Sequence, residues 1–371
     1  MIIGIPKEVK NHEYRVGMVP SSVKEFVTRG HKVLVETQAG EGIGFSDEHY
    51  KEAGAEIRKS AAEVWNDANM VIKVKEPLKE EFGFLREDLI LYTYLHLAAE
   101  PDLTKALIDS KCTAIAYETV TDDAGRLPLL APMSEVAGRM SVQVGAHFLE
   151  KAQGGSGVLL GGIPGVIPGN VVIIGGGIAG TNAAQMAVGM GATVTILDRS
   201  VERLRWLNSV FGASVTTCFS TTALVEHYVK HADLVVGAVL VAGASAPKLV
   251  TRDMLKTMRK GSVLVDIAID QGGCFETSKP TSHQKPIYEE EGILHYCVTN
   301  MPGAVARTST FGLNNVTLPY ALAIADNGAN AAMLAEEHLL NGVNVMKGHI
   351  VHHAVAESLD LAYTDPKSLF A

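Results

Sequence analysis

The chain has 371 residues, more than one domain usually holds, so we expect two domains. Hydrophobic residues make up 47% of the sequence, enough for sizeable cores, and the net charge of −9 argues against nucleic acid or an anionic membrane as a partner. The four cysteines are widely spaced and form no metal-ligand pattern. The amino terminus enters a strand-like run without a signal-peptide pattern, which predicts a cytoplasmic protein.

Strand-like and helical patterns alternate through the first third of the chain. A helix is expected to begin near Ser21 or Ser22, because Ser22 and Glu25 have the spacing of a capping box. The alternation predicts a parallel sheet with helices on its faces. The expected strands are Ile2–Ile5, Lys32–Glu36, Met70–Val74, Leu89–Leu95 and Thr113–Tyr117, and further helices are expected near Asp47–Ala53, Ala61–Ala68 and Asp102–Ile108.

A glycine-rich turn opens the middle third of the chain. The apolar run Val171–Ile174 leads into Gly175–Gly180, which has the pattern G-x-G-x-x-G and is followed by a helical stretch. The next strand-like run, Thr193–Leu197, is followed at once by Asp198. A strand, this turn, a helix and a second strand ending in an acid together indicate a dinucleotide-binding unit. The alternative is a glycine turn that only tightens helix packing.

Each glycine of this turn, and the acid after the second strand, has a physical role in binding a dinucleotide. Gly175 permits the tight turn, Gly177 lets the backbone approach a pyrophosphate, and Gly180 lets the helix pack close to the strand. The helix N-terminus offers N–H groups to the phosphates. Asp198 can accept hydrogen bonds from ribose hydroxyls and would repel a 2′-phosphate, which favours NAD over NADP. Arg199 weakens that preference slightly, because an arginine can pair with a phosphate.

A long uncharged stretch surrounds the turn. Residues 152–197 contain no charged side chain, a pattern that could suggest a membrane helix. Pro164, Pro168 and scattered glycines interrupt the stretch, whereas a membrane span needs roughly 20 uninterrupted apolar residues. We therefore expect no membrane-spanning segment.

The pattern predicts an α/β fold with two Rossmann-like, doubly wound parallel-sheet domains and a cleft between them. No strand is expected after Ala304, and helices are expected at Asn330–Leu340 and His353–Leu361. Because these helices are unlikely to form a domain alone, we expect them to pack on the first sheet. The predicted domains are residues 1–130 with 306–371 and residues 131–305, joined by helices near Ser134–Gln153 and Thr308–Ala325. The second domain's strands are expected at Val171–Ile174, Thr193–Leu197, Ser214–Thr217, Leu234–Gly237, Ser262–Asp266 and Leu294–Val298.

Ligands of open parallel sheets bind beyond the carboxyl ends of the strands, so residues at those ends are site candidates. In the first domain, Arg15 suits a substrate carboxylate, although it could be an ordinary surface arginine. Lys75 could polarise a carbonyl oxygen or could be a solvated strand end. His96 is the natural acid or base near neutral pH, but it could also be a core histidine with satisfied hydrogen bonds.

The second domain adds its own candidates. Asp270 follows a buried strand in a glycine-rich loop and is either catalytic or a turn or cap residue. In the tail, which is assigned to the first domain, the adjacent His352 and His353 lack a supporting ligand, so no metal site is predicted. No hydrolase or phosphotransferase signature occurs. The other strand-end candidates are Asp198, Ser220, Val239–Leu240, Ile267–Ile269 and Asn300–Met301.

Several motifs resemble the alanine dehydrogenase family along essentially the whole chain. They are Gly4–Glu8, Glu13–Val16, Lys73–Pro77, Leu91–Leu97, Pro132–Gly138, Asp266–Asp270 and Asn300–Val305. The resemblance implies a reversible, NAD-linked oxidative deamination of L-alanine to pyruvate and ammonia, in a cytoplasmic homohexamer with a discontinuous substrate domain.

The resemblance also implies roles for individual residues. Arg15 would bind the substrate carboxylate, Lys75 its carbonyl oxygen, and His96 and Asp270 would be the acid/base pair. The implied NAD site comprises Ser134, Gly175, Gly177, Ile178, Ala179, Gly180, Asp198, Arg203, Ser220, Val239, Leu240, Ile267, Ala268, Ile269, Asp270, Lys279, Val298, Thr299, Asn300 and Met301.

The chain departs from the family at one place. Some members carry a glutamate–histidine pair that binds magnesium in the helix after Pro319, where this chain reads Asp326–Gly328, so metal binding there is doubtful. Two alternative functions stay open. The NAD-binding subunit of proton-translocating transhydrogenase shares the opening motif and the cofactor fold, and an NAD(H)-sensing protein would also explain Gly175–Asp198. Neither explains Arg15, Lys75, His96 and Asp270 together.

Overall fold

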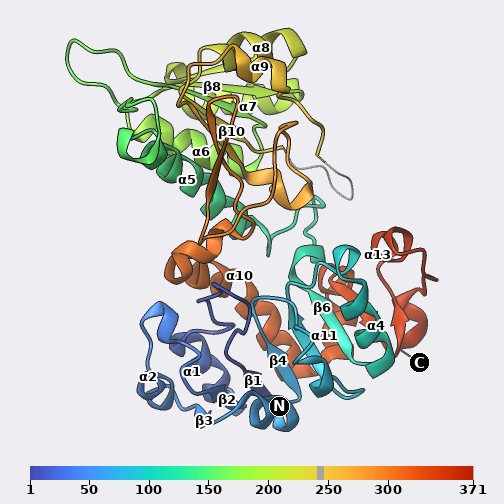
Figure 1. The fold of residues 1–371 in the computed structure, drawn as a ribbon. Helices are drawn as coiled ribbons and strands as arrows, with labels where there is room; N and C mark the ends of the chain where they lie inside the picture. Colours follow the sequence, from blue (N-terminus) through green and yellow to red (C-terminus); the bar gives the residue numbers. More distant parts are fainter. Residues whose placement is uncertain (240–245, 371) are drawn as a thin grey trace. The chain divides into compact units, whose positions relative to one another are not determined.

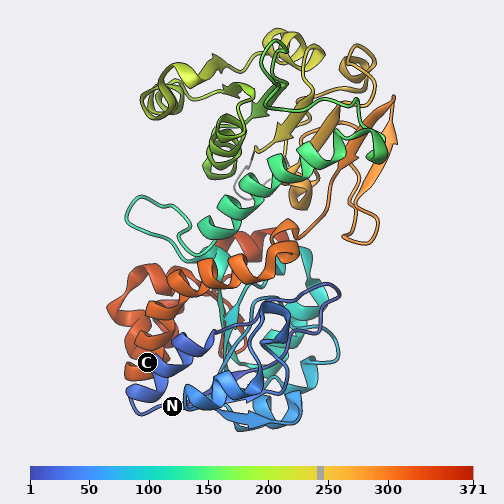
Figure 2. The same cartoon turned by 90° about the vertical axis from the view of Figure 1, so that its left-hand side faces the viewer.

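The computed structural model describes residues 1–239 and 246–370. It contains two compact units: unit 1 is Met1–Met133 with Gly303–Ala371, and unit 2 is Ser134–Pro302. Figure 1 shows that the first and last segments of the chain both belong to unit 1 and that the middle segment forms unit 2. Each unit has a twisted sheet with helices packed against it (Figures 1 and 2), so the predicted two-domain α/β fold is confirmed.

Unit 1 contains an eight-stranded sheet in the order β15-β14-β6-β5-β4-β1-β2-β3. Strands β1 to β6 pair in parallel, and β14 and β15 add an antiparallel edge. The strands are β1 (Ile2–Ile5), β2 (Lys32–Glu36), β3 (Glu56–Arg58), β4 (Met70–Ile72), β5 (Ile90–Thr93), β6 (Thr113–Ala116), β14 (Val343–Met346) and β15 (His349–Ile350).

The tail of the chain was expected to lack strands, and that expectation is wrong. Strands β14 and β15 form a hairpin, and β14 extends the unit 1 sheet beside β6. Their connection is Lys347–Gly348, and both residues have positive φ, as a two-residue hairpin turn requires. Four-residue and two-residue strands are too short to show a clear alternation in the sequence.

The helices of unit 1 cover both faces of its sheet. The helices α11 and α12 replace the single helix expected at Asn330–Leu340, because the chain is extended at Glu336 between them. The helices are α1 (Pro20–Thr28), α2 (Asp47–Glu52), α3 (Ala61–Asp67), α4 (Pro101–Ser110), α10 (Ala306–Asn327), α11 (Ala329–Ala335), α12 (Glu337–Asn341) and α13 (His353–Ser358), with 3-10 turns η1 (Glu41–Ile43), η2 (Phe82–Phe84), η3 (Leu97–Ala99), η4 (Tyr117–Thr119) and η9 (Pro366–Leu369).

The predicted capping box of the first helix is also wrong. Helix α1 begins at Pro20, which suits the first helical position because proline has no N–H group to satisfy. Ser22 is buried inside the helix, and its hydroxyl donates to Oδ1 of Asn314 at 3.1 Å. The same oxygen accepts the backbone N–H of Val19 at 2.7 Å. A side chain almost three hundred residues away therefore accepts the hydrogen bonds at the start of this helix. The spacing of nearby residues cannot reveal such a partner.

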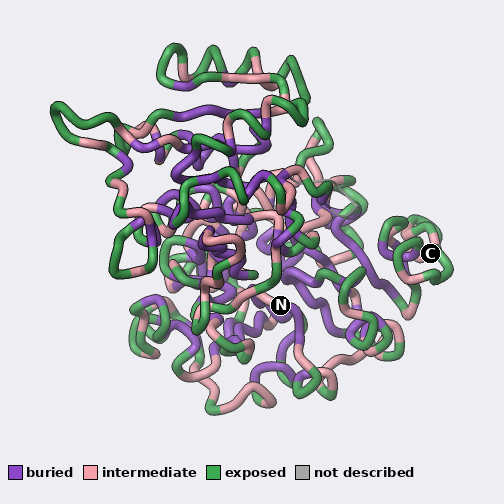
Figure 3. Tube along the Cα trace, turned by 45° about the horizontal axis from the view of Figure 1, so that its top comes forward, coloured by how far each residue is buried: buried purple, intermediate pink, exposed green. Residues whose placement is uncertain are grey.

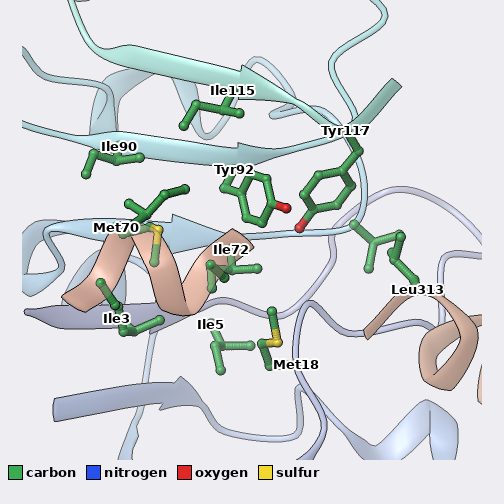
Figure 4. Packing of buried hydrophobic residues seen from close by; sticks show 14 of the residues in the cluster. Ile3, Ile5, Met18, Met70, Ile72, Ile90, Tyr92, Ile115, Tyr117 and Leu313 are labelled. Atoms are coloured by element: carbon green, nitrogen blue, oxygen red, sulfur yellow. The ribbon is translucent and has the colours of Figure 1, made fainter. Parts of the chain in front are cut away.

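The main core of unit 1 lies between one face of the sheet and helices α1 and α10. Figure 4 shows alternate residues of the central strands, such as Ile72 and Tyr92, directed to this side, with Leu313 of α10 close to Tyr117. The rings of Tyr92 and Tyr117 pack edge to face with centroids 4.4 Å apart. The hydroxyl of Tyr117 donates to the carbonyl oxygen of Lys73 at 2.9 Å, so this buried polar group is satisfied.

Unit 2 contains a seven-stranded sheet in the order β12-β13-β11-β10-β7-β8-β9. All neighbours pair in parallel except the edge strand β12, an antiparallel strand that was not expected. Without β12 the order is that of a doubly wound nucleotide-binding sheet. The strands are β7 (Asn170–Ile174), β8 (Thr193–Asp198), β9 (Val215–Phe219), β10 (Leu234–Gly237), β11 (Val263–Asp266), β12 (Ile287–Glu290) and β13 (Ile293–Tyr296).

The central strands of both units are buried, whereas the edge strands β3 and β12 are partly exposed, and Figure 3 shows buried segments inside the molecule with exposed segments around them. Within residues 1–239 and 246–370, no helix is long and apolar enough to cross a membrane. The helices of unit 2 are α5 (Ala131–Phe148), which begins in unit 1, α6 (Ile178–Gly189), α7 (Val201–Phe211), α8 (Thr222–Lys230) and α9 (Arg252–Lys256), with 3-10 turns η5 (Lys151–Gln153), η6 (Gly212–Ser214), η7 (Ile267–Gln271) and η8 (Met301–Val305).

The packing of α10 predicts that one core substitution will strongly lower the stability of unit 1. Leu313→Ala should lower the free energy of unfolding of unit 1 by about 2–5 kcal/mol, because it leaves a cavity beside Tyr117. Urea unfolding followed by the fluorescence of the fully buried Trp65 would measure this. Leu334→Ala, at a side chain that is 62% exposed, is the matched control and should change stability by no more than about 0.5 kcal/mol.

Candidate functional site

Three adjacent parallel strands of unit 1 lead into the three substrate-site candidates. Strand β4 lies between β1 and β5 and pairs with both. Arg15 lies in the segment after β1, Lys75 follows β4, and His96 follows β5. Because parallel strands end at the same edge of a sheet, the structure brings these three residues to one edge of unit 1.

Arg15 is a buried residue rather than a surface arginine. Its side chain is almost fully enclosed, and Glu13 accepts hydrogen bonds from both Nε and Nη2 at 2.6 Å. Burial opposes the charged form, but the bonds and charge of Glu13 outweigh it and raise the pKa of Arg15. Nη1 lies 3.1 Å from Sδ of Met133. Since Glu13 occupies the Nε–Nη2 fork, a substrate carboxylate would have to be bound through Nη1.

Lys75 is half-buried, and Glu8 holds its backbone. Oε1 of Glu8 accepts the N–H of Val74 at 2.6 Å and that of Lys75 at 3.4 Å. The carbonyl oxygen of Lys75 accepts a hydrogen bond from the hydroxyl of Thr93 at 3.0 Å, which ties the end of β4 to β5. These bonds fix the backbone from which the ammonium group projects.

A buried ion cluster that the sequence analysis missed shares Glu8 with the backbone of Lys75. The ammonium group of Lys73 is fully enclosed, 2.8 Å from Glu81 and 3.3 Å from the second carboxylate oxygen of Glu8. Burial raises the pKa of Glu8, although Lys73 opposes this effect. The alternation of Lys73 and Lys75 with apolar residues was visible in the sequence, but a strand pattern gives no sign of which carboxylates a buried lysine will meet.

His96 stands at an exposed turn and is not a buried core residue. Its side chain is 42% exposed, and its backbone is left-handed, with φ of 51°. The imidazole stacks on the ring of Tyr94, with centroids 5.8 Å apart and planes 7° apart. Burial raises the pKa of Tyr94, and the nearby charge of Arg15 opposes that rise. Tyr94 therefore links the surroundings of Arg15 and His96.

The glycine turn of unit 2 has the shape that a dinucleotide requires. Gly175 has φ of 100°, and a Cβ at Gly180 would lie only 1.8 Å from the carbonyl oxygen of Gly175. A Cβ at Gly177 would instead meet no atom within 4 Å, so open space lies beside this glycine at the start of α6. Gly138 of α5 supports the turn, because a Cβ there would lie 2.1 Å from the carbonyl oxygen of Ala179.

Asp198 and Arg203 brace this turn from the next strand and helix. The Asp198 carboxylate accepts the N–H of Gly176 at 2.7 Å and that of Ser200 at 2.8 Å. Arg203 donates through Nε to the carbonyl oxygen of Gly176 at 2.5 Å and through Nη2 to Thr181 at 2.8 Å. Its guanidinium carbon also lies 3.9 Å from the ring centroid of Trp206, a half-exposed residue that the sequence analysis did not single out.

Asp266 organises the loop that carries Asp270. It is buried at the end of β11, where its carboxylate accepts the N–H groups of Ala268 at 3.1 Å and Cys274 at 2.9 Å and the hydroxyl of Ser278. Burial raises the pKa of Asp266, although these hydrogen bonds oppose the rise. Asp266 is the N-cap of the turn η7, and Asp270 lies exposed inside it. The structure therefore assigns the capping role to Asp266 and not to Asp270.

The remaining cofactor candidates lie mainly at the carboxyl ends of the unit 2 strands. Ser134 lies on α5 one turn before Gly138, and the ammonium group of Lys279 is 2.5 Å from Glu290. Leu240 lies outside the described residues. Ile178 and Ala179 begin α6, Ser220 follows β9, Val239 follows β10, Ile267, Ala268 and Ile269 lie in η7 after β11, Val298, Thr299 and Asn300 follow β13, and Met301 begins η8.

The carboxylate of Asp326, where some family members bind magnesium, is held by two side chains of unit 1. It lies 2.5 Å from Nη1 of Arg29 and 2.8 Å from Nε2 of His31. The hydrogen bonds of His31 and Arg29 lower the pKa of Asp326. Among the residues that the structure describes, no group of three or more histidine, cysteine, aspartate or glutamate side chains is arranged to hold a metal ion.

The open space beside Gly177 predicts a separation of folding from cofactor binding. Gly177→Ala should change the free energy of unfolding by no more than about 0.5 kcal/mol, because its Cβ meets no protein atom. It should weaken NADH binding at least about tenfold, because that Cβ would stand where the pyrophosphate approaches. NADH fluorescence titration and thermal unfolding would measure the two effects. Gly189→Ala, at the other end of α6 and equally unobstructed, should bind NADH like the unmodified protein.

Comparisons with known proteins agree with this geometry. The models of the alanine dehydrogenase/PNT family match residues 4–137 with their N-terminal domain and residues 141–353 with their C-terminal domain. Alanine dehydrogenase of Halomonas elongata is 57% identical over 369 residues, which is 100% of both chains. Alanine dehydrogenase of Methanococcus maripaludis is 57% identical and alanine dehydrogenase 2 of Staphylococcus aureus is 58% identical, each over 98% of both chains.

Solved structures give the same result. A structure of L-alanine dehydrogenase superimposes with a TM-score of 0.95 at 54% identity, covering 98% of this chain and 100% of the other. A transhydrogenase from Sinorhizobium meliloti has a TM-score of 0.82 at 24% identity over 95% of this chain and 100% of the other, which shows a shared fold. The resemblance found in the sequence is therefore confirmed: the chain belongs to the alanine dehydrogenase/PNT family.

Proposed function

We propose that this protein catalyses the reversible, NAD-dependent oxidative deamination of L-alanine to pyruvate and ammonia. The observation that carries the proposal is the placement of Arg15, Lys75 and His96 at the ends of three neighbouring parallel strands. A cationic pair for an anionic substrate and an acid/base group at one sheet edge suit the deamination of an amino acid. Full-length relatives at 57–58% identity carry the name alanine dehydrogenase.

The cofactor of the family is a nicotinamide dinucleotide, and the glycine turn of unit 2 fits such a molecule. The residues that would hold it are Gly175, Gly177 and the first N–H groups of α6 at the pyrophosphate and Asp198 at the adenosine ribose. When bound, such a cofactor would supply the hydride acceptor that the oxidation of the amino acid's α-carbon requires. We propose NAD rather than NADP, because the carboxylate of Asp198 would repel a 2′-phosphate.

Unit 1 supplies the groups that bind and polarise the substrate. Arg15 would bind the carboxylate through Nη1, because Glu13 holds the other side of the guanidinium group. The same ion pair fixes the orientation of Arg15, so little conformational entropy is lost when substrate binds. Lys75 would donate to the oxygen that becomes the carbonyl of pyruvate and would stabilise its developing negative charge.

His96 is proposed to move the protons of the reaction. As a base it would take a proton from the water that adds to the imino carbon, and as an acid it would return a proton when ammonia leaves. Its exposed turn gives the ring access to water, whereas a core histidine would have none. The resemblance proposes Asp270 as the second acid/base group, and its exposed position in η7 leaves that carboxylate accessible.

The resemblance to the family also suggests the roles of the two domains, the cellular compartment and the assembly. We propose that residues 1–130 with 306–371 form the substrate domain and residues 131–305 the NAD domain. We further propose a cytoplasmic homo-oligomer, which in the family is a hexamer. Analytical ultracentrifugation would test the assembly.

The activity and the role of His96 are tested together. The purified protein should reduce NAD in the presence of L-alanine, followed by NADH absorbance, and a panel of other L-amino acids would rank its specificity. His96→Ala should lower kcat by about 10²–10⁴-fold with NADH affinity unchanged, because the ring serves the chemical step. A near-normal kcat would remove His96 from the chemistry. Tight NADH binding without turnover of any amino acid would favour the transhydrogenase-like or sensing function.

The charge of Asp198 predicts the cofactor preference. Asp198→Asn keeps an oxygen that can accept the N–H of Gly176 or Ser200 but removes the repulsion of a 2′-phosphate. The ratio of kcat/KM for NADP to that for NAD should rise by roughly tenfold or more. Glu202→Gln, which neutralises an exposed acid in the first turn of α7, is the matched control. An unchanged ratio in Asp198→Asn would show that another residue sets the preference.

A further inference from the structure

Glu118 contacts the turn that carries His96. It lies in η4, directly after β6, and β6 pairs in parallel with β5, the strand that leads to His96. One of its carboxylate oxygens accepts the backbone N–H of His96 at 2.6 Å and that of Leu95 at 3.1 Å. The same oxygen lies 3.9 Å from Nδ1 of the His96 ring. One carboxylate therefore meets both the backbone and the ring of His96.

We propose that Glu118 is a positioning residue that holds His96 in its working orientation. The inference rests on the proposed function, in which His96 moves protons. The carboxylate holds the two N–H groups of a backbone conformation that residues other than glycine seldom adopt. The same carboxylate lies 3.9 Å from Nδ1 of the ring, so Nε2 is left to meet substrate and water.

The groups around the His96 ring support this assignment. Tyr94 stacks on one face of the imidazole, so the ring is held by packing as well as by charge. Helix α13 packs against η3, and His352 at the N-cap of α13 is close enough for the charge of Glu118 to act on it. Burial lowers the pKa of His352, and Glu118 opposes this effect while His353 reinforces it. The negative charge of Glu118 thus faces two imidazoles, of which His96 is the exposed one.

Two substitutions separate the structural bonds of Glu118 from its charge. Glu118→Gln keeps an oxygen that can accept both N–H groups and should fold normally, whereas Glu118→Ala removes the bonds as well and should be less stable. In Glu118→Gln we expect kcat to fall about tenfold, with KM for NAD unchanged. KM for L-alanine should change less than kcat, because the ring that serves the chemical step has lost its anchor while the groups that bind the substrate have not.

A modification experiment gives a readout that does not depend on turnover. Diethyl pyrocarbonate reacts with accessible imidazole nitrogen, so the rate of His96 modification at one fixed pH, read by peptide mass spectrometry, reports how the ring is held. In Glu118→Gln this rate should change, while that of His147, a half-exposed histidine of unit 2, should not. Glu357→Gln, which removes an exposed acid next to His353, is the matched control and should leave the His96 rate unchanged.

The outcomes distinguish the inference from the proposed function. A Glu118→Gln variant with the kcat and the His96 modification rate of the unmodified protein would overturn the positioning role. If the unmodified protein turns over no amino acid, the proposed function fails, yet a changed modification rate in Glu118→Gln would still show that Glu118 positions the His96 ring. Partial recovery of kcat in Glu118→Asp, which restores the charge, would support the role of the carboxylate.

Discussion

The parallel pairing of β1, β4 and β5 is the constraint on which the candidate site depends. Three chain segments that are distant in sequence end at one edge because their strands lie side by side in the same direction. A slip of one residue would move Lys75 to the opposite face, since side chains alternate along a strand. The apolar residues of β4 and β5 that pack against α10 fix this register, so the hydrophobic core determines where the polar groups stand.

Buried ion pairs are the second feature on which the candidate site at this sheet edge depends. Arg15 with Glu13, and Lys73 with Glu8 and Glu81, are removed from water, which carries a desolvation penalty, whereas burying apolar groups is favourable. Each cation is compensated by carboxylates within 3.3 Å, so no charge is left alone. Apolar side chains would fill the same space at lower cost. Rigid ion pairs instead fix the orientation of groups that must meet a small, charged substrate.

Periodicity and motif spacing were sufficient to predict the central strands, the glycine turn and the placement of Arg15, Lys75 and His96 at strand ends. These features depend on local pattern and on general rules for parallel sheets. The start of α1 and the edge strand β14 were not predictable in this way, because Asn314 and β6, which stabilise them, are distant in sequence. The partners that orient the candidates, such as Glu8 and Glu118, were missed for the same reason.

Glu8 and Glu118 share one arrangement with Asp198, the carboxylate of unit 2 that the sequence did predict. Glu8 follows β1 and holds the N–H groups after β4, Glu118 follows β6 and holds those after β5, and Asp198 ends β8 and holds the N–H of Gly176 after β7. In each case a carboxylate beyond one strand binds the loop that leaves the neighbouring strand. A parallel sheet leaves N–H groups at its carboxyl edge that the ladder cannot pair, and anionic side chains satisfy them strongly. The loops thus become rigid where ligands bind, and the electrostatic surroundings of each candidate residue are set by its neighbouring strand.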